Sequence, residues 1–573
     1  MSLLERFVER TEFDGLDDFL KNFRLKIPEK PFNFGYDVVD AYAREEPDRR
    51  ALVWADDDGS MRTFTFADMK DASDRAAAVM AAHGVKKGDS VMLVLKNRFE
   101  FWFCIVGCHK LGAVAVPATH MLMVHDLVYR FGRAKVRMII TADDDRLAGD
   151  VESACAEVEK AGGQAPVRAK VCGPRPGWVD FTAELEGAGG RWSEPAGAER
   201  PGGRDPMLAY FSSGTTGEPK MVLHDHLYAL GHIITAKWWH QVRDGGLHYT
   251  VADTGWGKAV WGNLYGQWIC GCATFVHDYR KFVAAKTLAI SSKAGITSFC
   301  APPTVYRFLA KEDIGAYDFS NLEHAAVAGE PLNPEVYQRF LAATGLRLME
   351  AYGQTETTLV IGNFAWMEPK PGSMGKPSPL FHARLVNAEG KECDVGEHGE
   401  MVIPLPADGS VENRPAGLTR GYVNDPDATA QSERGGVYHT GDVAWRDEDG
   451  YFWFVGRDDD LIKSSGYRIG PFEVESALME HPAVRECAVT GIPDPDRGQI
   501  VKATIVPTKD YEYVLTDPAR AEALTKELQT HVKRATAPYK YPRCVEYVPE
   551  SEMPKTISGK IQRKAIRDRD LKK

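Results

Sequence analysis

A nonapeptide rich in glycine and hydroxyl side chains is the strongest chemical signal in this 573-residue chain. It reads Ser212-Ser213-Gly214-Thr215-Thr216-Gly217-Glu218-Pro219-Lys220 and follows the apolar run Leu208–Phe211. Glycines let a backbone bend tightly and turn its N–H groups toward phosphate oxygens, while hydroxyls and a lysine add donors and positive charge. The segment therefore predicts a loop that holds a polyphosphate, although it lacks the Walker A spacing. A solvent-exposed Ser/Thr/Gly turn is the simpler alternative.

Two other polar segments have the residue types needed for the rest of a nucleotide. In Tyr352-Gly353-Gln354-Thr355-Glu356-Thr357, a carboxylate beside hydroxyls can bind Mg²⁺ through one oxygen while phosphates supply others. In Tyr438-His439-Thr440-Gly441-Asp442, a carboxylate after a glycine can accept hydrogen bonds from both hydroxyls of a ribose. Taken alone, each segment could equally be an ordinary polar turn with Thr or Asp capping.

The last part of the chain contains two more segments of this kind. The first is Gly456-Arg457, followed by Asp459-Asp460-Leu461-Ile462-Lys463 and Ser464-Ser465-Gly466-Tyr467-Arg468. The second is Pro554-Lys555-Thr556-Ile557-Ser558-Gly559-Lys560. In isolation, a lysine such as Lys560 in a basic tail would usually be a plain surface charge.

Short apolar runs between helix-like segments must position these residues. We expect strands at Val91–Leu95, Ala113–Val116, Val136–Thr141, Leu208–Phe211, Ala273–Val276, Thr297–Ala301 and Ala325–Ala328. Helical patterns cover Phe66–His83 and Glu100–Leu111. Strands that alternate with helices predict an α/β fold with parallel or mixed sheets and helices on their faces.

The carboxyl-terminal third is organised differently. Residues 369–454 are rich in Gly, Pro and Asp with short strand signals, which predicts a β-rich subdomain. The pattern after them is typical of a small α+β domain: helix Pro471–Glu480, strands Cys487–Thr490 and Val501–Val506, helix Asp517–Arg534 and strand Val545–Val548. Because single cores stop growing at about 250–300 residues, we expect at least two domains. We place the boundary at the acidic run Asp458–Asp460 that precedes this unit, giving domains 1–458 and 459–573.

The composition limits the function classes. Lys+Arg is 70 and Asp+Glu is 81, giving 70 − 81 = −11, which argues against a general nucleic-acid binder. Ten cysteines without a metal-ligand spacing suggest buried, reduced thiols. The first ten residues lack the features of a signal or transit peptide, and the most apolar stretch, 101–116, contains His109 and Lys110. We therefore expect a cytoplasmic protein with no membrane span.

Taken together, these segments resemble the acyl-adenylate-forming superfamily of acyl-CoA synthetases, luciferases and peptide-synthetase adenylation domains. All five occur in the family's order, from about residue 50 to the end. Within the superfamily the chain resembles the medium-chain acyl-CoA synthetases most, through residues 352–357, 464–471 (Ser-Ser-Gly-Tyr-Arg-Ile-Gly-Pro) and 537–543 (Ala-Pro-Tyr-Lys-Tyr-Pro-Arg). The resemblance implies an AMP-forming ligase that makes an acyl-adenylate and passes the acyl group to coenzyme A.

The resemblance also assigns nucleotide contacts. Residues 212–220 would hold the β- and γ-phosphates, Tyr352 would lie against the adenine, Thr355 would contact the α-phosphate and Glu356 would bind Mg²⁺. The other implied ATP contacts are Gly329, Glu330 and Pro331 at the adenine, Glu350, Ala351, Gly353 and Gln354 around Tyr352, Asp442 and Arg457 at the ribose, and Arg468 at the phosphates.

The same resemblance makes Lys560 the catalytic residue. Its ammonium would lie between the acid's carboxylate and the α-phosphate, where charge builds up in the transition state. A small mobile domain would then turn about a hinge at Asp459, exchanging the lysine loop for the segment around Gly466. The residues that would contact coenzyme A are Ser465, Gly466, Tyr467, Arg497, Lys540 and Arg543, the last three of which could also be ordinary solvated charges.

The acyl pocket is implied less sharply. In acetate-specific members of the family a tryptophan stands at the position of Gly353, so glycine predicts room for a longer, branched or aromatic acid. The other pocket candidates are Trp256, Lys258, Trp261, Cys300 and Gly329. The two tryptophans could equally be core packing, and Lys258 either lies outside the pocket or narrows the substrate range. One methylene is worth only about 1–3 kcal/mol of discrimination, so the sequence does not define chain length.

Two other functions compete with the acid:CoA ligase. An adenylation enzyme could load the thiol of a separate carrier protein; a fused carrier would need further residues after Lys560, and the chain has 573. A non-enzymatic nucleotide-binding protein would be expected to lack Lys560, Glu356 or Asp442, and all are present. The expected partners are ATP, a carboxylic acid and coenzyme A, with Mg²⁺ as cofactor and a homo-oligomer possible.

Overall fold

The computed structural model describes residues 2–187, 190–212, 218–330, 332, 334–465, 467–556 and 560–571, with only the backbone of residue 468. The contacts between residues divide the chain into two units. Unit 1 contains Met1–Ser212, Pro219–Ala383 and Pro404–Tyr438. Unit 2 contains Ser213–Glu218, Arg384–Ile403 and His439–Lys573.

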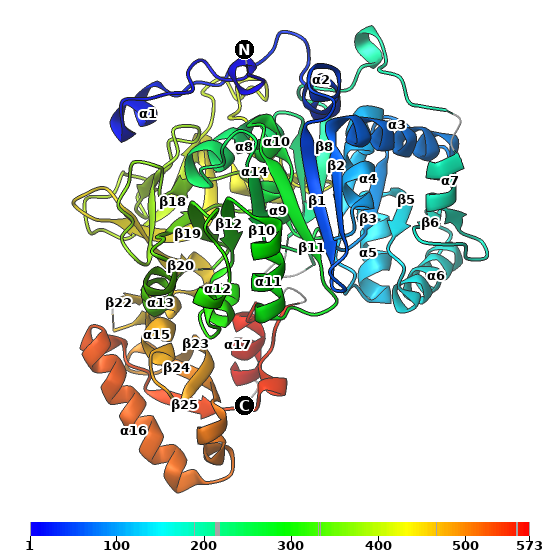
Figure 1. The fold of residues 1–573 in the computed structure, drawn as a ribbon. Helices are drawn as coiled ribbons and strands as arrows, with labels where there is room; N and C mark the ends of the chain where they lie inside the picture. Colours follow the sequence, from blue (N-terminus) through cyan, green and yellow to red (C-terminus); the bar gives the residue numbers. More distant parts are fainter. Residues whose placement is uncertain are drawn as a thin grey trace. The chain divides into compact units, whose positions relative to one another are not determined.

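The first sheet of unit 1 is built from strand–helix repeats (Figure 1). Its strand order is β7-β6-β5-β3-β4-β8-β9, and every pair is parallel except β8 with β9. The strands are β3 (Ser90–Val94), β4 (Val114–Pro117), β5 (Val136–Thr141), β6 (Val167–Lys170), β7 (Val179–Asp180), β8 (Pro206–Phe211) and β9 (Met221–Asp225). The connecting helices are α3 (Phe66–Ala82), α4 (Glu100–Leu111), α5 (Val124–Ala134), α6 (Asp145–Lys160) and α7 (Phe181–Gly187).

The second sheet of unit 1 is mixed. Its order is β16-β15-β14-β13-β12-β10-β11-β1-β2, parallel from β14 to β1 and antiparallel at both ends. The strands are β1 (Arg50–Asp56), β2 (Met61–Thr65), β10 (Leu247–Thr250), β11 (Ala273–Asp278), β12 (Ser298–Ala301), β13 (His324–Ala328), β14 (Leu348–Tyr352), β15 (Ile361–Gly362) and β16 (Ser373–Pro377). The remaining α-helices of unit 1 are α1 (Leu16–Asn22), α2 (Asp40–Glu45), α8 (Tyr228–Ile234), α9 (Gly257–Gly262), α10 (Tyr265–Ile269), α11 (Ala284–Ala294), α12 (Pro303–Leu309), α13 (Pro334–Thr344) and α14 (Pro426–Ser432).

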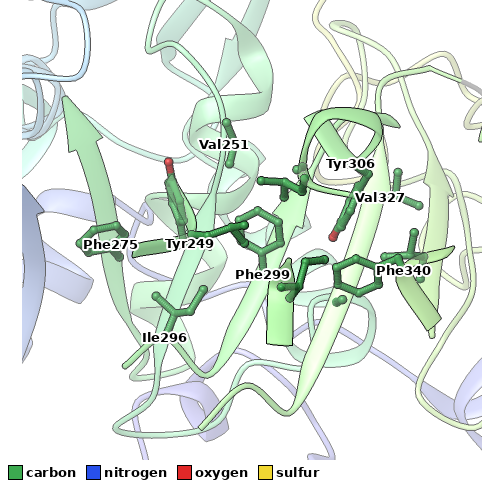
Figure 2. Close-up of a cluster of buried hydrophobic side chains, with 14 of the residues drawn as sticks. Tyr249, Val251, Phe275, Ile296, Phe299, Tyr306, Val327 and Phe340 are labelled. Carbon is green, nitrogen blue, oxygen red and sulfur yellow. The ribbon is translucent and has the colours of Figure 1, made fainter. Parts of the chain in front are cut away.

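An aromatic core fixes helices α11 to α13 on this sheet (Figure 2). Phe299 of β12 packs edge-on against Tyr306 of α12, and Tyr306 packs in the same way against Phe340 of α13. Burying each such ring stabilises the fold by roughly 1.5–3 kcal/mol. The core therefore holds the carboxyl ends of β12, β13 and β14 in place, and several candidate site residues follow these ends.

Unit 2 contains two groups of strands. The order β17-β18-β19-β20 includes antiparallel pairs at β17/β18 and β19/β20, and the order β22-β21-β24-β23 has β25 parallel to β24. The strands are β17 (Arg384–Val386), β18 (Gly399–Pro404), β19 (Val437–Arg446), β20 (Phe452–Arg457), β21 (Ile462–Ser464), β22 (Tyr467–Ile469), β23 (Val484–Asp494), β24 (Gly498–Pro507) and β25 (Cys544–Tyr547). The α-helices are α15 (Pro471–Met479), α16 (Pro518–Ala535) and α17 (Arg563–Leu571).

The α/β class with mixed sheets and a small α+β region is confirmed. Helix α3 begins where a capping box forms: Thr65 Oγ1 accepts from the amide of Asp68, and the Asp68 carboxylate accepts from the amide of Thr65. Strands β23 and β24 are longer than expected because their polar ends pair in a hairpin. The contact division places 439–458 with the residues that follow, so the predicted boundary near Asp459 stays a prediction.

All ten thiols are free, and eight of them are buried, as the composition suggested. Within the described part of the chain, no helix combines the length and apolar character needed to cross a bilayer.

Candidate functional site

The hydroxyl-rich segment 212–220 joins two antiparallel strands. Ser212 donates its amide to the carbonyl of Lys220 at 2.8 Å, and Tyr129 donates its hydroxyl to the carbonyl of Pro219 at 2.9 Å. These bonds fix both ends of the loop, and Glu218 is exposed. The remaining predicted phosphate contacts, Ser213, Gly214, Thr215, Thr216 and Gly217, lie outside the described residues.

A carboxylate and an ammonium meet around one tyrosine of unit 1. Tyr422 donates its hydroxyl to Glu356 Oε1 at 3.0 Å, and Lys220 Nζ lies 4.8 Å from the centre of the Tyr422 ring. The carbonyl of Glu356 also accepts from the amide of Thr419 at 2.7 Å. The sequence analysis missed Tyr422, whose only local signal is its place after Arg420-Gly421 in an irregular loop. The contact brings together the predicted metal ligand and the predicted phosphate lysine.

The turn that carries Glu356 starts where β14 ends. Gln354 donates its amide to Thr357 Oγ1 at 3.0 Å, and Thr357 donates its amide to the carbonyl of Gln354 at 3.2 Å. Tyr352 is the last residue of β14 and is partly buried, as is Thr355. These reciprocal bonds hold residues 352–357 as one compact turn.

Gly353 in this turn lies against an indole ring. A Cβ added at Gly353 would lie 2.3 Å from Cη2 of Trp261 and 2.7 Å from the carbonyl oxygen of Thr358. Trp261, on α9, is 8% exposed and donates its Nε1–H to the hydroxyl of Tyr228 at 3.1 Å. The structure thus brings together two predicted pocket residues, and glycine is the residue that leaves room for the ring.

Three other pocket candidates lie near one another. Lys258 Nζ donates to the carbonyl of Ala328 at 2.6 Å and would lie 3.9 Å from a Cβ at Gly329, which has a φ of +107°. Burial raises the pKa of the Cys300 thiol, and the positive charge of Lys258 opposes that rise. Trp256 precedes α9 and is only partly buried. Lys258 is therefore turned toward the end of β13, and its role in the acyl pocket stays a prediction.

Glu350 of β14 contacts Leu332, which directly follows the predicted adenine segment 329–331. Glu350 Oε1 accepts from the amide of Leu332 at 3.3 Å, while Oε2 has no hydrogen-bond partner among the described residues. Burial raises the pKa of Glu350 to about 8. Thr304 donates its hydroxyl to Glu330 at 2.9 Å, Ala351 is buried in β14, and Pro331 lies outside the described residues.

The predicted ribose residues of unit 2 face each other across two strands. Asp442 pairs with Arg457 in the β19/β20 ladder, and Arg457 Nη1 lies 3.8 Å from Asp442 Oδ1. Arg457 Nε also lies 3.5 Å from Oδ1 of Asp459, the predicted hinge residue. The next residue, Asp460, is an ion-pair partner of Arg563 and Arg567 on α17. Adjacent aspartates thus contact different elements.

Lys560 is exposed, and its backbone is hydrogen-bonded to Thr556. Thr556 donates its amide to the carbonyl of Lys560 at 2.7 Å, and the Lys560 amide donates to Thr556 Oγ1 at 3.1 Å. The helix that follows is fixed by Arg563, which donates twice to the Glu475 carboxylate at 3.0 and 2.6 Å. Two hydrogen bonds thus join Lys560 to Thr556, and residues 557–559 lie outside the described residues.

The predicted coenzyme A residues fall into small groups. Arg497 donates to Ser465 Oγ at 3.3 Å. The ring of Tyr467 stacks on that of Tyr539 at 4.1 Å. Lys540 and Arg543 already have partners: Lys540 Nζ lies 2.6 Å from the Glu473 carboxylate, and Arg543 donates to the Tyr541 hydroxyl at 2.7 Å. Gly466 and the side chain of Arg468 lie outside the described residues.

Comparison with known proteins gives consistent matches. The model of the AMP-binding enzyme family matches residues 39–422, and that of the AMP-binding enzyme C-terminal domain matches residues 473–560. Mitochondrial acyl-coenzyme A synthetase ACSM3 of Mus musculus is 40% identical over 97% of this chain and 94% of its own length. Mitochondrial acyl-coenzyme A synthetase ACSM5 of Homo sapiens is 42% identical over 96% of this chain and 92% of its own length.

Solved structures resemble the chain over nearly its whole length. An acyl-CoA synthetase of Brucella canis has a TM-score of 0.71 at 31% identity, covering 98% of this chain and 99% of that one. The anthranilate CoA ligase AuaEII, solved in complex with anthranoyl-AMP, has a TM-score of 0.81 at 27% identity, covering 95% of this chain and 98% of that one.

The expected cytoplasmic location is wrong on these findings, because the matching acyl-coenzyme A synthetases are mitochondrial proteins. The expectation had rested on general composition and on the charged residues at 1–10. A folded enzyme of this composition is equally compatible with either compartment, so these features could not distinguish them.

Proposed function

The chain belongs to the AMP-binding enzyme family and, within it, to the acyl-coenzyme A synthetases, and we propose that it joins a medium-chain, branched or aromatic carboxylic acid to coenzyme A. In the first step the acid's carboxylate attacks the α-phosphorus of ATP, giving an acyl-adenylate and pyrophosphate. In the second step the thiol of coenzyme A attacks the acyl carbon, and AMP leaves.

One observation supports this proposal: the turn 352–357 contacts residues predicted for the phosphates at one end and a residue predicted for the acyl pocket at the other. At one end Glu356 bonds to Tyr422, whose ring lies beside the Lys220 ammonium. At the other end Gly353 lies against the Trp261 indole. A reaction that joins a carboxylic acid to a nucleotide phosphate needs phosphate-binding groups and acyl-binding groups close to one another.

The residues of the turn fit a magnesium ion. Mg²⁺ is usually held by one or two carboxylates together with substrate phosphates and water, so a single carboxylate such as Glu356 is an adequate protein contribution. When bound, the ion would neutralise phosphate charge.

In this proposal Lys560 supplies the cation of the first step. Its ammonium would lie between the carboxylate and the α-phosphate, which repel one another until a positive charge intervenes. Such a preorganised charge contributes most in the transition state, when negative charge builds up on the phosphate oxygens. The two hydrogen bonds between Thr556 and Lys560 suit that role because they limit how far the lysine backbone can move.

We place the hinge of the second step at Asp459. It lies between Arg457, which pairs with Asp442, and Asp460, which pairs with α17. A change in backbone angles there would turn residues 459–573 relative to 1–458 without unfolding either. The Ser465–Arg497 contact and the Tyr467–Tyr539 stack are the groups we assign to coenzyme A.

The test is acid-driven exchange of labelled pyrophosphate into ATP by the intact protein with magnesium, followed by thioester formation on adding coenzyme A. A panel of straight, branched and aromatic acids should support exchange to different extents, and coenzyme A should saturate the second step. No exchange with any acid would refute the proposal. Exchange without thioester formation from free coenzyme A would point instead to a carrier-protein thiol.

A further inference from the structure

Four side-chain and backbone contacts form a closed ring behind the turn 352–357. His224 Nε2 lies 2.7 Å from the carbonyl oxygen of Thr355, and the His224 ring lies 4.0 Å from that of Tyr228. The Tyr228 hydroxyl accepts from Trp261 Nε1 at 3.1 Å, and the Trp261 indole lies against Gly353. Since Gly353 is two residues from Thr355, the contacts return to the turn where they began.

The chemistry of the ring fixes which atoms carry protons. A carbonyl can only accept, so His224 carries its hydrogen on Nε2 and donates it to Thr355. His224 Nδ1 then has a lone pair with no partner in the part of the chain that the structure describes. Burial lowers the pKa of His224 to about 4, so the ring stays neutral near pH 7.

Ordinary core packing explains these contacts less well. Every side chain of the ring is buried: Tyr228 is 1% exposed, His224 0% and Trp261 8%. Yet two of the links are directional hydrogen bonds from polar groups that an apolar core would not need. A hydrogen bond between buried polar groups is strengthened by the low dielectric of the protein interior and specifies how its two partners are arranged. Here the arrangement that is specified joins the wall of the acyl pocket to the phosphate end of the site.

We propose that His224 and Tyr228 are positioning residues that couple the acyl-pocket wall at Trp261 to the turn at Thr355, a role that rests on the proposed function. An acyl group that presses on Trp261 shifts the Tyr228–His224 pair, and through it the carbonyl of Thr355. The length and shape of the acid then affect the turnover of adenylation and the affinity for ATP. By linkage, ATP must change the affinity for the acid by the same factor.

The first experiment replaces Tyr228→Phe, which removes one hydroxyl and leaves the indole N–H of Trp261 without its acceptor. In pyrophosphate–ATP exchange, wild-type protein should show an ATP KM that differs between a short and a long acid. In the variant, the KM for ATP should no longer depend on the acid. The ratio of activities with the two acids should fall by at least about fivefold, which is the lower end of the usual coupling between two sites. The matched control is Tyr306→Phe, another buried tyrosine, which donates to the carbonyl of Ala326 at 2.9 Å within the core of Figure 2.

The second experiment compares His224→Gln with His224→Leu. Gln can place an N–H near the position of Nε2 and should restore most of the coupling, whereas Leu cannot donate to Thr355. Equal coupling in both variants, together with an unchanged acid profile in Tyr228→Phe, would overturn the inference while wild-type exchange still upheld the proposed function. If the wild-type protein showed no pyrophosphate–ATP exchange, both the inference and the proposed function would be refuted. Circular dichroism and thermal unfolding of each variant separate loss of fold from loss of coupling.

Discussion

At the scale of single residues, the two steps of the reaction should separate at Lys560. Lys560→Ala removes the charge that opposes repulsion between carboxylate and phosphate, so adenylate formation should fall by about 10²–10³-fold. Thioester formation from pre-made acyl-adenylate should be nearly unchanged, because that step lacks this repulsion. Pyrophosphate release and thioester production, measured separately, check the split. Lys564→Ala, on the adjacent helix, is the control; equal loss of both steps in Lys560→Ala would contradict the assigned role.

A second residue-scale prediction concerns Gly353. The position cannot accept even a Cβ unless Trp261 moves, because that Cβ would lie 2.3 Å from Cη2 of the Trp261 ring. Gly353→Trp should therefore close the pocket and reduce kcat/KM for an eight-carbon acid relative to a three-carbon acid by about tenfold or more. Acid-dependent pyrophosphate exchange measures the ratio. Gly149→Trp is the matched control, because a Cβ added there meets nothing within 4 Å. An unchanged ratio would remove Gly353 from the pocket.

At the scale of elements, strand β14 contains the buried carboxyl of Glu350, whose titration should make the free energy of unfolding depend on pH. Burial raises the pKa of Glu350 to about 8, above the value of 4.5 expected when the chain is unfolded. Between these values the unfolded chain has released the proton and the folded chain has kept it. Stability should therefore fall as pH rises from about 4.5 to 8, by up to about 1.4 kcal/mol per pH unit.

Glu350→Gln keeps the shape of the neutral acid but cannot titrate, so it should remove this pH-dependent loss of stability. The variant should therefore become more stable relative to wild type as pH rises from about 4.5 to 8. Denaturant unfolding at pH 5.5, 6.5 and 7.5 measures the difference. The exposed Glu335→Gln is the matched control. Parallel stability curves for Glu350→Gln and wild type would show that Glu350 does not keep its proton.

Elements also show what the sequence could and could not predict. Helix α4 has the bounds expected from its apolar run, and β5 spans the predicted 136–141. Strand ends elsewhere moved by a few residues because pairing partners, not local composition, decide where a ladder stops. The ring formed by His224, Tyr228 and Trp261 could not be foreseen, since its members come from separate elements and only Trp261 was a predicted site residue. Tyr422 was missed for the same reason.

At the scale of the whole molecule, the order of the motifs along the chain was enough to predict the family, and the alternation of apolar runs with helical patterns was enough to predict the α/β class. The motif order could not predict which unit contains residues 384–403. Their contacts place them in the same unit as residues 439–573. Their short strands pair with partners that lie far away in sequence, such as β18 with β19. Long-range pairing is decided by tertiary packing that no local pattern records. The same limit applies to compartment, which the composition of a folded enzyme does not encode.

Buried histidines give unit 1 a collective response to acid. Burial lowers the pKa of His224 and His324 to about 4, and of His226 and His248 to about 3. Their pKa when unfolded is about 6.5, so below that pH the unfolded chain takes up protons that the folded chain refuses. Each histidine should therefore reduce stability by up to about 1.4 kcal/mol per pH unit as pH falls from 6.5 toward 4.

His226→Leu tests this response most directly, because neither nitrogen of His226 has a hydrogen-bond partner among the described residues. Between pH 6.5 and 4.5, the free energy of unfolding of the variant should fall less than that of wild type, by the contribution of one histidine. Above pH 7, the difference between the two proteins should not depend on pH. Denaturant unfolding followed by tryptophan fluorescence measures both. The exposed His125→Leu should leave the acid response as in wild type. If His226→Leu and wild type lose stability in parallel, His226 must already accept a proton in the folded protein, and its burial does not exclude the charge.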